Sequence, residues 1–145
     1  MTPVSVEDLV AQGRVQRVEA DVTTAGEMLN EASRHLGSAT AIAVSDPNGS
    51  YSLLYDAARK AVTGHMLASG YRVRNRPGSH EAVALYAEAA LAGAPHAHHV
   101  GELDRMRRDR NRSEYWVRVF GRAEIEADLE HAKQIIAAAE AQWPA

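Results

Sequence analysis

Apolar positions recur along this chain with the three- and four-residue spacing of amphipathic helices, and the alternation typical of strands is scarce. At 100° per residue, a group of small side chains and one histidine falls within about 60° of Leu54. These residues are Ala57, Ala58, Ala61, His65 and Ala68. A second stripe closes the chain and consists of Ile125, Leu129, Ala132, Ile136, Ala139 and Trp143. Both stripes predict helices with closely packed inner faces.

The whole pattern predicts six helices, over residues 5–17, 21–36, 51–70, 79–91, 96–119 and 123–143. Asp21 or Thr23 can cap the second helix, and Gly37 is expected to end it. Turn-forming residues at 45–50 predict a loop before the third helix. Short connections favour antiparallel neighbours. The predicted fold is therefore all-α, an antiparallel up-and-down bundle of four to five helices, in one domain over 1–145 with a flanking helical extension over 1–20.

Composition excludes several classes of protein. The 145 residues contain no cysteine, so a disulfide framework, a thiolate metal site and a cysteine nucleophile are all excluded. No apolar run approaches the roughly 18–20 residues that span a bilayer, and the first residues do not have the pattern of a signal peptide. We therefore expect a cytoplasmic protein with no membrane partner. The net charge of −3 gives no global indication of nucleic acid binding, so any such signal must be local.

A local signal lies in "RMRRDRNRSEYW", residues 105–116, which has five arginines within eight positions. On a helical projection the buried stripe is predicted to contain His99, Leu103, Met106 and Val117. Arg107 and Arg110 point toward that stripe. The other three arginines face away from it, toward solvent: Arg105, Arg108 and Arg112.

An inward arginine requires a partner, because an unpaired guanidinium costs several kcal/mol to bury. Glu114 follows Arg110 by four residues and can pair with it, and Asn111 can accept from Arg107. In one alternative, the stripe is a hydrogen-bonded polar layer inside the bundle or at a dimer seam. In the other, the stripe lines an open cleft. Tyr115 lies at the margin of the same face, where its ring can be buried and its hydroxyl solvated.

A second basic stretch, "YRVRNRPG", adds Arg72, Arg74 and Arg76. Together the two stretches hold eight of the sixteen lysines and arginines. If the loop folds beside the fifth helix, the result is a basic stripe suited to a phosphate backbone. Otherwise these arginines are simply solvated.

The histidines give weaker signals. His65 on an inner helix face is expected to be a hydrogen-bonded core residue, with a role as a surrogate base in the cleft as the alternative. His80 is expected to cap or pack at the start of the fourth helix. Among the histidines at 96–99, only His96 and His99 have a helical metal-ligand spacing, and no supporting carboxylate precedes Glu102, so no metal site is expected. No phosphate-loop or dinucleotide motif is present, and no cofactor is expected.

Three segments, in order, resemble the HEPN family (higher eukaryotes and prokaryotes nucleotide-binding). They are "YSLLYDAARKAV" (51–62), "ASGYRVRNRPGSHEAV" (68–83) and "LDRMRRDRNRSEYW" (103–116), and the resemblance extends over about residues 30–140. It implies a helical bundle that forms a homodimer, with a shared basic cleft that cuts RNA without metal. The family signature is an arginine, usually a polar residue, and then a histidine. In this chain the resemblance places Arg110 and Asn111 at the first two positions.

Tyr115 stands where the signature has histidine. A phenol titrates at about pH 10 in model peptides and is a poor general base at neutral pH. The resemblance thus implies a bacterial toxin–antitoxin or phage-defence component whose RNA cleavage is weakened or moved to another residue, with an antitoxin such as a nucleotidyltransferase as partner. Tyr115 can instead orient a ribose, stack on a base, or be modified by a partner. Two alternatives stay open: a non-catalytic module that binds RNA, nucleotide or a nucleotidyltransferase, and a purely structural helical dimer.

Overall fold

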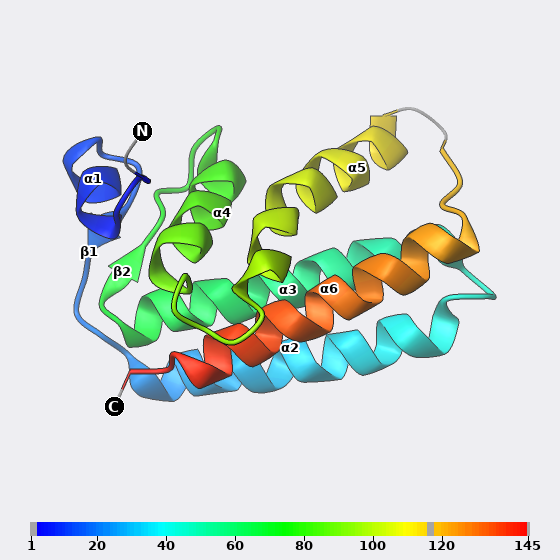
Figure 1. Cartoon of the computed structure of the whole chain (residues 1–145), viewed down its shortest axis with the longest axis horizontal. Helices are drawn as coiled ribbons and strands as arrows, with labels where there is room; N and C mark the ends of the chain where they lie inside the picture. Colours follow the sequence, from blue (N-terminus) through cyan, green and yellow to red (C-terminus); the bar gives the residue numbers. More distant parts are fainter. Residues whose placement is uncertain (1–2, 116–117, 145) are drawn as a thin grey trace.

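The computed structural model describes residues 3–115 and 118–144, and most of them lie in helices (Figure 1). The helices are α1 (Val6–Ala11), α2 (Val22–Ile42), α3 (Pro47–Ala68), α4 (Ser79–Ala90), the 3₁₀ helix η1 (Ala97–Glu102), α5 (Leu103–Tyr115) and α6 (Arg122–Ala141). Two short strands, β1 (Gln16–Arg17) and β2 (Tyr71–Arg72), pair in antiparallel fashion. The expectation of a mainly helical fold is confirmed.

The long helices α2 and α3 form an antiparallel hairpin. Near its closed end the Ser50 hydroxyl donates to the Ala39 carbonyl over 2.7 Å. Further along, Lys60 donates to Glu31 over 2.8 Å. At the far end Gly64 lets the two backbones approach closely, because a Cβ there would lie 3.1 Å from the Ala25 carbonyl oxygen. This pair of helices follows the predicted up-and-down order.

Helix α6 packs on both members of the hairpin but runs in the same direction as α3 (Figure 1). Two contacts establish this direction. Tyr51, early in α3, donates to Asp128, early in α6, over 2.8 Å. His65, late in α3, is 2.8 Å from the carbonyl oxygen of Gln142, just after α6. In a strict up-and-down bundle, α6 would run antiparallel to α3. The predicted order is not followed here because α4 lies across the hairpin instead of along it (Figure 1).

The N-terminal extension is only partly helical. The predicted helix over 5–17 ends at Ala11, and the chain turns through Gly13, whose φ of 72° suits a residue without a side chain. Gln16 and Arg17 then pair with β2. Propensity alone missed this ribbon because its partner strand lies beyond both long helices of the hairpin in sequence.

Two helix boundaries also differ from the prediction. Helix α2 continues through Gly37 to Ile42, since one interior glycine costs only about 1 kcal/mol relative to alanine. Helix α3 begins inside the predicted loop, with Asp46 accepting from the Gly49 N–H over 3.0 Å and Pro47 in the first turn. An aspartate cap followed by proline begins a helix, and turn propensity concealed it.

The predicted fifth helix over 96–119 consists of η1 and α5. The left-handed backbone of His96 (φ 58°) precedes η1, and α5 continues to Tyr115. Leu103 and Met106 are buried as expected, His99 is partly buried, and Val117 lies outside the described residues.

The core consists mainly of small aliphatic side chains and three tyrosines, Tyr51, Tyr55 and Tyr86. The inner face predicted around Leu54 on α3 is buried throughout. On α6 the predicted stripe is buried except for Leu129 and Trp143, which stay partly exposed. Among the described helices, none combines the length and the apolar character that crossing a membrane requires.

Candidate functional site

A pocket of about 280 Å³ separates the beginning of α4 from α5. One wall consists of the turn before α4 and the first residues of α4, together 76–81, and includes Arg76 and His80. The other wall is α5, which contributes Arg107 and Asn111. Of the three arginines in the basic loop, Arg76 lines this pocket, whereas Arg72 and Arg74 do not.

Arg110 lies one residue before Asn111 and is held at the inner side of α5. Its guanidinium carbon is 5.8 Å from the centre of the Tyr55 ring on α3, a cation–π arrangement. Its Nη2 pairs with Glu114 over 3.2 Å, as the i,i+4 spacing predicted. The side chain keeps 24% of its surface exposed, and its Nε has no hydrogen-bond partner among the described residues. Arg110 is thus neither sealed in the core nor fully solvated, and one of its donors lacks an acceptor.

His80 is the histidine that this fold brings to the arginines of α5. Its Nδ1 lies 3.4 Å from the Tyr55 hydroxyl, so His80 and Arg110 contact the same tyrosine. Burial, and then the positive charges of Arg59 and Arg110, lower the pKa of His80 below its usual 6.5. The imidazole is therefore neutral at pH 7.

Burial also raises the pKa of Tyr55 to about 12, so that its hydroxyl stays protonated. The Tyr55 hydroxyl can accept from Nδ1–H of neutral His80 or donate to Nδ1, and in the first of these two tautomers the lone pair of Nε2 is free. That is the form of imidazole that accepts a proton from a ligand.

The α5 arginines are largely neutralised by neighbouring carboxylates. Arg107 pairs with Asp104 over 2.9 Å, and not with Asn111 as one alternative predicted. Asp104 also lies 3.5 Å from Arg108, and Asp109 lies 3.7 Å from Arg112. The predicted stripe of positive charge is thus a network of ion pairs, and its local field is weaker than the arginine count indicates.

Arg105 corrects the prediction that three of these arginines face solvent. It donates to Asp128 on α6 over 2.6 Å and also pairs with Glu102 and Asp109. Asp128 is buried, so this arginine serves to hold α5 against α6. Helical projection could not detect the contact because Asp128 belongs to a different helix.

Arg108 and Arg112 are exposed, as predicted, and do not line the pocket. Tyr115 is 82% exposed at the last turn of α5 and is not among the residues that line the pocket either. The structure thus brings together Arg107, Asn111, Arg76 and His80. Arg110 is not among the residues that line the pocket, and it is connected to His80 through Tyr55. The structure leaves Tyr115 outside this group.

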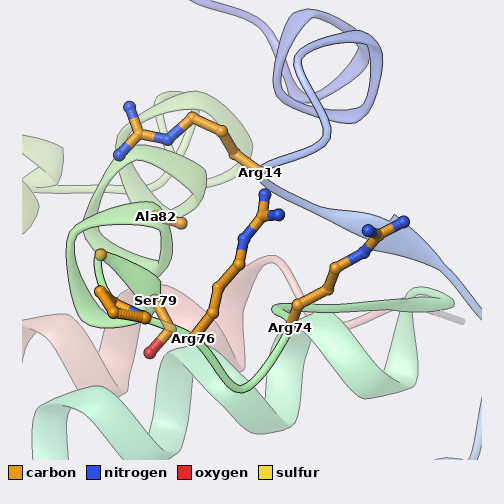
Figure 2. A pocket seen from close by; sticks show the side chains of 7 residues that line it. Arg14, Arg74, Arg76, Ser79 and Ala82 are labelled. Atoms are coloured by element: carbon orange, nitrogen blue, oxygen red, sulfur yellow. The ribbon is translucent and has the colours of Figure 1, made fainter.

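A second, smaller pocket of about 70 Å³ lies on the other side of the same turn and is lined by Arg14, Arg74 and Arg76 (Figure 2). Arg74 and Arg76 come from the loop before α4, and Arg14 comes from the segment after α1. Arg72 is not part of it, because this residue lies on β2 and its Nε donates to Gln16 over 3.1 Å.

His65 is a core residue rather than a member of the site. Its side chain is buried, its Nδ1 is 2.9 Å from the Tyr86 hydroxyl, and its Nε2 is 2.8 Å from the Gln142 carbonyl oxygen. Because a carbonyl only accepts, Nε2 carries the proton and Nδ1 accepts from Tyr86. With both nitrogens engaged, His65 cannot act as a surrogate base in the cleft.

His96, His98, His99 and His131 form a small cluster. Nδ1 of His99 lies 2.9 Å from Nδ1 of His131, and the rings of His98 and His99 are 4.2 Å apart. In the described part of the chain, no group of three or more histidine, aspartate or glutamate side chains is arranged to hold a metal ion.

Sequence reasoning missed two members of these pockets, His80 and Arg14. His80 was expected only to cap or pack, although the Pro-Gly-Ser-His turn that carries it is one of the segments on which the family resemblance depends. Arg14 lies in a region predicted to be helical and has no distinguishing neighbours in sequence.

Comparison with protein-family models, curated proteins and solved structures finds no match for this chain.

Proposed function

We propose that this chain is a HEPN-type protein that binds RNA in the pocket between α4 and α5, with Arg110 and Asn111 at the phosphate and His80 in the place of the missing signature histidine. The observation that carries the proposal is the position of His80, which shares Tyr55 with Arg110. The three-dimensional arrangement thus supplies an imidazole beside the arginine where the linear motif supplies a phenol.

Phosphate is the ligand group that this pocket suits best. Guanidinium groups bind phosphate oxygens through two parallel N–H donors. The Nε of Arg110 is buried without an acceptor, and the part of this side chain that stays exposed is available to a phosphate. Arg76 and Arg107 border the same space from opposite walls. The Asn111 amide can donate to a phosphate or bond a ribose hydroxyl.

His80 adds chemistry that phosphate binding alone does not need. In the proposed reaction, Nε2 of neutral His80 takes the proton of a ribose 2′-hydroxyl as the 2′ oxygen attacks the adjacent phosphorus. The bond to the 5′ oxygen of the next nucleotide breaks, that oxygen takes a proton from water, and His80 then returns its proton to the solvent. The products are a 2′,3′-cyclic phosphate and a 5′-hydroxyl. No metal takes part, and the arginines stabilise the charge on the phosphate oxygens.

A non-catalytic RNA- or nucleotide-binding module is the second candidate, and the α5 ion pairs favour it. Arg110 already pairs with Glu114, so a ligand phosphate must compete with a carboxylate for it. The exposed Tyr115 at the end of α5 is then free to stack on a base or to meet a partner protein. In both candidates the protein acts as a homodimer, and a nucleotidyltransferase antitoxin is the proposed partner.

The test is RNA cleavage and RNA binding by four purified proteins: wild type, Arg110→Ala, His80→Gln and, as control, Arg122→Ala. Arg122 is a matched control because it is an exposed arginine that pairs with Glu126 at the start of α6, away from the pocket. We expect wild type and Arg122→Ala to cleave a single-stranded RNA in the presence of EDTA. Arg110→Ala is expected to lose binding by tenfold or more (about 1.4 kcal/mol), and His80→Gln to bind but not cleave.

Each outcome selects one of the candidates. Binding without cleavage by the wild type, lost in Arg110→Ala, supports the non-catalytic module. Cleavage that survives His80→Gln removes His80 from the mechanism. No RNA binding by the wild type, with Arg110→Ala changing thermal stability alone, supports a structural helical dimer and contradicts the proposal.

A further inference from the structure

The small pocket lined by Arg14, Arg74 and Arg76 is a basic concavity next to the proposed RNA site. Three arginines line it, and Figure 2 shows Arg74 and Arg76 together on the loop before α4, with the Arg14 guanidinium directed away from theirs. Neither Pro77 nor Ala82, which also line it, can neutralise them. An anion in this pocket is attracted by the positive charges of all three side chains.

The charge of this pocket is poorly compensated by the protein. Arg14 pairs with Glu81 over 3.2 Å, and that carboxylate is half exposed. Arg76 donates to the Gly13 carbonyl, which carries no formal charge. Arg74 is exposed, and within residues 3–115 and 118–144 it has no ion pair or side-chain hydrogen bond. This contrasts with α5, where each of the five arginines at 105–112 has a carboxylate partner.

The two pockets are adjacent because they share one wall. Residues 76–79 line both, with the arginine triad on one side and Arg107 and Asn111 on the other. Arg76 contributes to both sides. A ligand that fills both pockets must pass over this turn and carry two anionic groups, one for each pocket. A nucleic acid strand carries a phosphate at every nucleotide, whereas a mononucleoside monophosphate carries a single one.

We propose that the Arg14–Arg74–Arg76 pocket binds a second phosphate of the RNA strand that occupies the α4–α5 pocket, so that the ligand is an oligonucleotide. The inference rests on the proposed function and narrows its substrate class. It assigns Arg14 and Arg74 to affinity for the strand and leaves the reacting phosphate to Arg110 and its neighbours.

The experiment measures binding of fluorescein-labelled single-stranded RNA of two, four and eight nucleotides by anisotropy, in EDTA and at several salt concentrations. The RNA carries 2′-O-methyl groups so that it cannot be cleaved. The proteins are wild type, the double variant Arg14→Gln/Arg74→Gln, Arg110→Ala and a control, Arg34→Gln, which removes an exposed arginine of α2. Arg76 is left in place because it also contacts Gly13.

We expect wild type and Arg34→Gln to gain at least tenfold in affinity from two to eight nucleotides. The double variant is expected to bind the dinucleotide as wild type does and to show no gain with length. Its slope of log affinity against log salt falls by about 0.7 for each phosphate that the variant no longer neutralises. A DNA strand of the same sequence is expected to show the same gain, because the pocket recognises phosphate.

Three results overturn the inference while leaving the proposed function intact, provided that Arg110→Ala still weakens binding. They are equal affinity for two and eight nucleotides in the wild type, a double variant that keeps the gain with length, and a gain seen with RNA but absent with DNA. A wild type that binds none of the strands overturns both proposals. Circular dichroism confirms that each variant is folded.

Discussion

Arg105 on α5 donates to both carboxylate oxygens of Asp128 on α6, at 2.6 Å and 3.2 Å. Tyr51 of α3 donates to the same carboxylate over 2.8 Å, so one buried group joins three helices. Hydrogen bonding to Asp128 is the main reason that the pKa of Arg105 is raised above its usual value. The contact sets the position of α5, and with it the orientation of the arginines that follow.

This relationship makes Arg105 a stability residue. Arg105→Ala leaves the Asp128 carboxylate buried with only Tyr51 as partner, and is expected to lower the free energy of unfolding by about 3 kcal/mol. Arg112→Ala, which breaks an exposed pair, is expected to cost less than about 1 kcal/mol. Urea unfolding followed by circular dichroism measures both. Equal losses in the two variants would show that the α5–α6 contact contributes no more to stability than an exposed ion pair.

Substitution of Arg110 is expected to reduce RNA affinity with little effect on the free energy of unfolding. Its contacts with the half-exposed Glu114 and with the Tyr55 ring are together worth about 1 kcal/mol, so Arg110→Ala should unfold only slightly more easily than wild type. Thermal melts and RNA-binding measurements on wild type and Arg110→Ala test this expectation. A loss of several kcal/mol without any change in RNA affinity would assign Arg110 a structural role.

Two glycines inside helices are expected to respond differently to substitution, because their surroundings differ. A Cβ at Gly37 meets nothing within 4 Å, so Gly37→Ala is expected to stabilise the protein by about 0.5–1 kcal/mol through helix propensity alone. A Cβ at Gly64 would lie 3.1 Å from the Ala25 carbonyl oxygen, and Gly64→Val is expected to cost about 1–3 kcal/mol by forcing α2 and α3 apart.

Gly37→Val is the control for the Gly64 variant, since it has the same propensity change without the clash. Chemical denaturation of the three variants gives the comparison. If Gly64→Val and Gly37→Val were equally stable, the close approach of the two helices would not be a constraint.

The free energy of unfolding is expected to fall as the pH is lowered, because of His65. Burial lowers the pKa of His65 below 6.5, so that under mildly acidic conditions the unfolded chain takes up a proton that the folded chain does not. Stability is therefore complete above about pH 6.5 and declines below it until the lower folded pKa is reached, at up to about 1.4 kcal/mol per pH unit for one proton.

Unfolding in urea at pH 7.5, 6.5 and 5.5 measures this slope. His65→Gln is expected to be less stable at pH 7.5 and to have a shallower dependence on pH, whereas His98→Gln, which replaces an exposed histidine, keeps most of the wild-type slope. A steep dependence that persists in His65→Gln would assign the effect to other groups, such as His80 and His99, whose pKa values burial also lowers.

Local spacing along the chain was enough to predict the helical character, the inner faces of α3 and α6, and the Arg110–Glu114 pair. These features depend on residues three or four positions apart, and helix geometry brings such residues together without further information. Asp21 as the cap of α2 is another local feature, confirmed by its contact with the Thr24 N–H at 3.0 Å.

The packing of whole elements was needed for the direction of α6, the pairing of β1 with β2, the role of Arg105 and the composition of both pockets. Asp128 and Arg105 lie on different helices, as do His80 and Arg110, and both long helices of the hairpin separate Arg14 from Arg74 in sequence. Periodicity along one helix holds no information about the element that faces it, because that neighbour is selected only when helices pack. For this reason the linear motif leads to Tyr115, whereas packing places His80 beside the arginines.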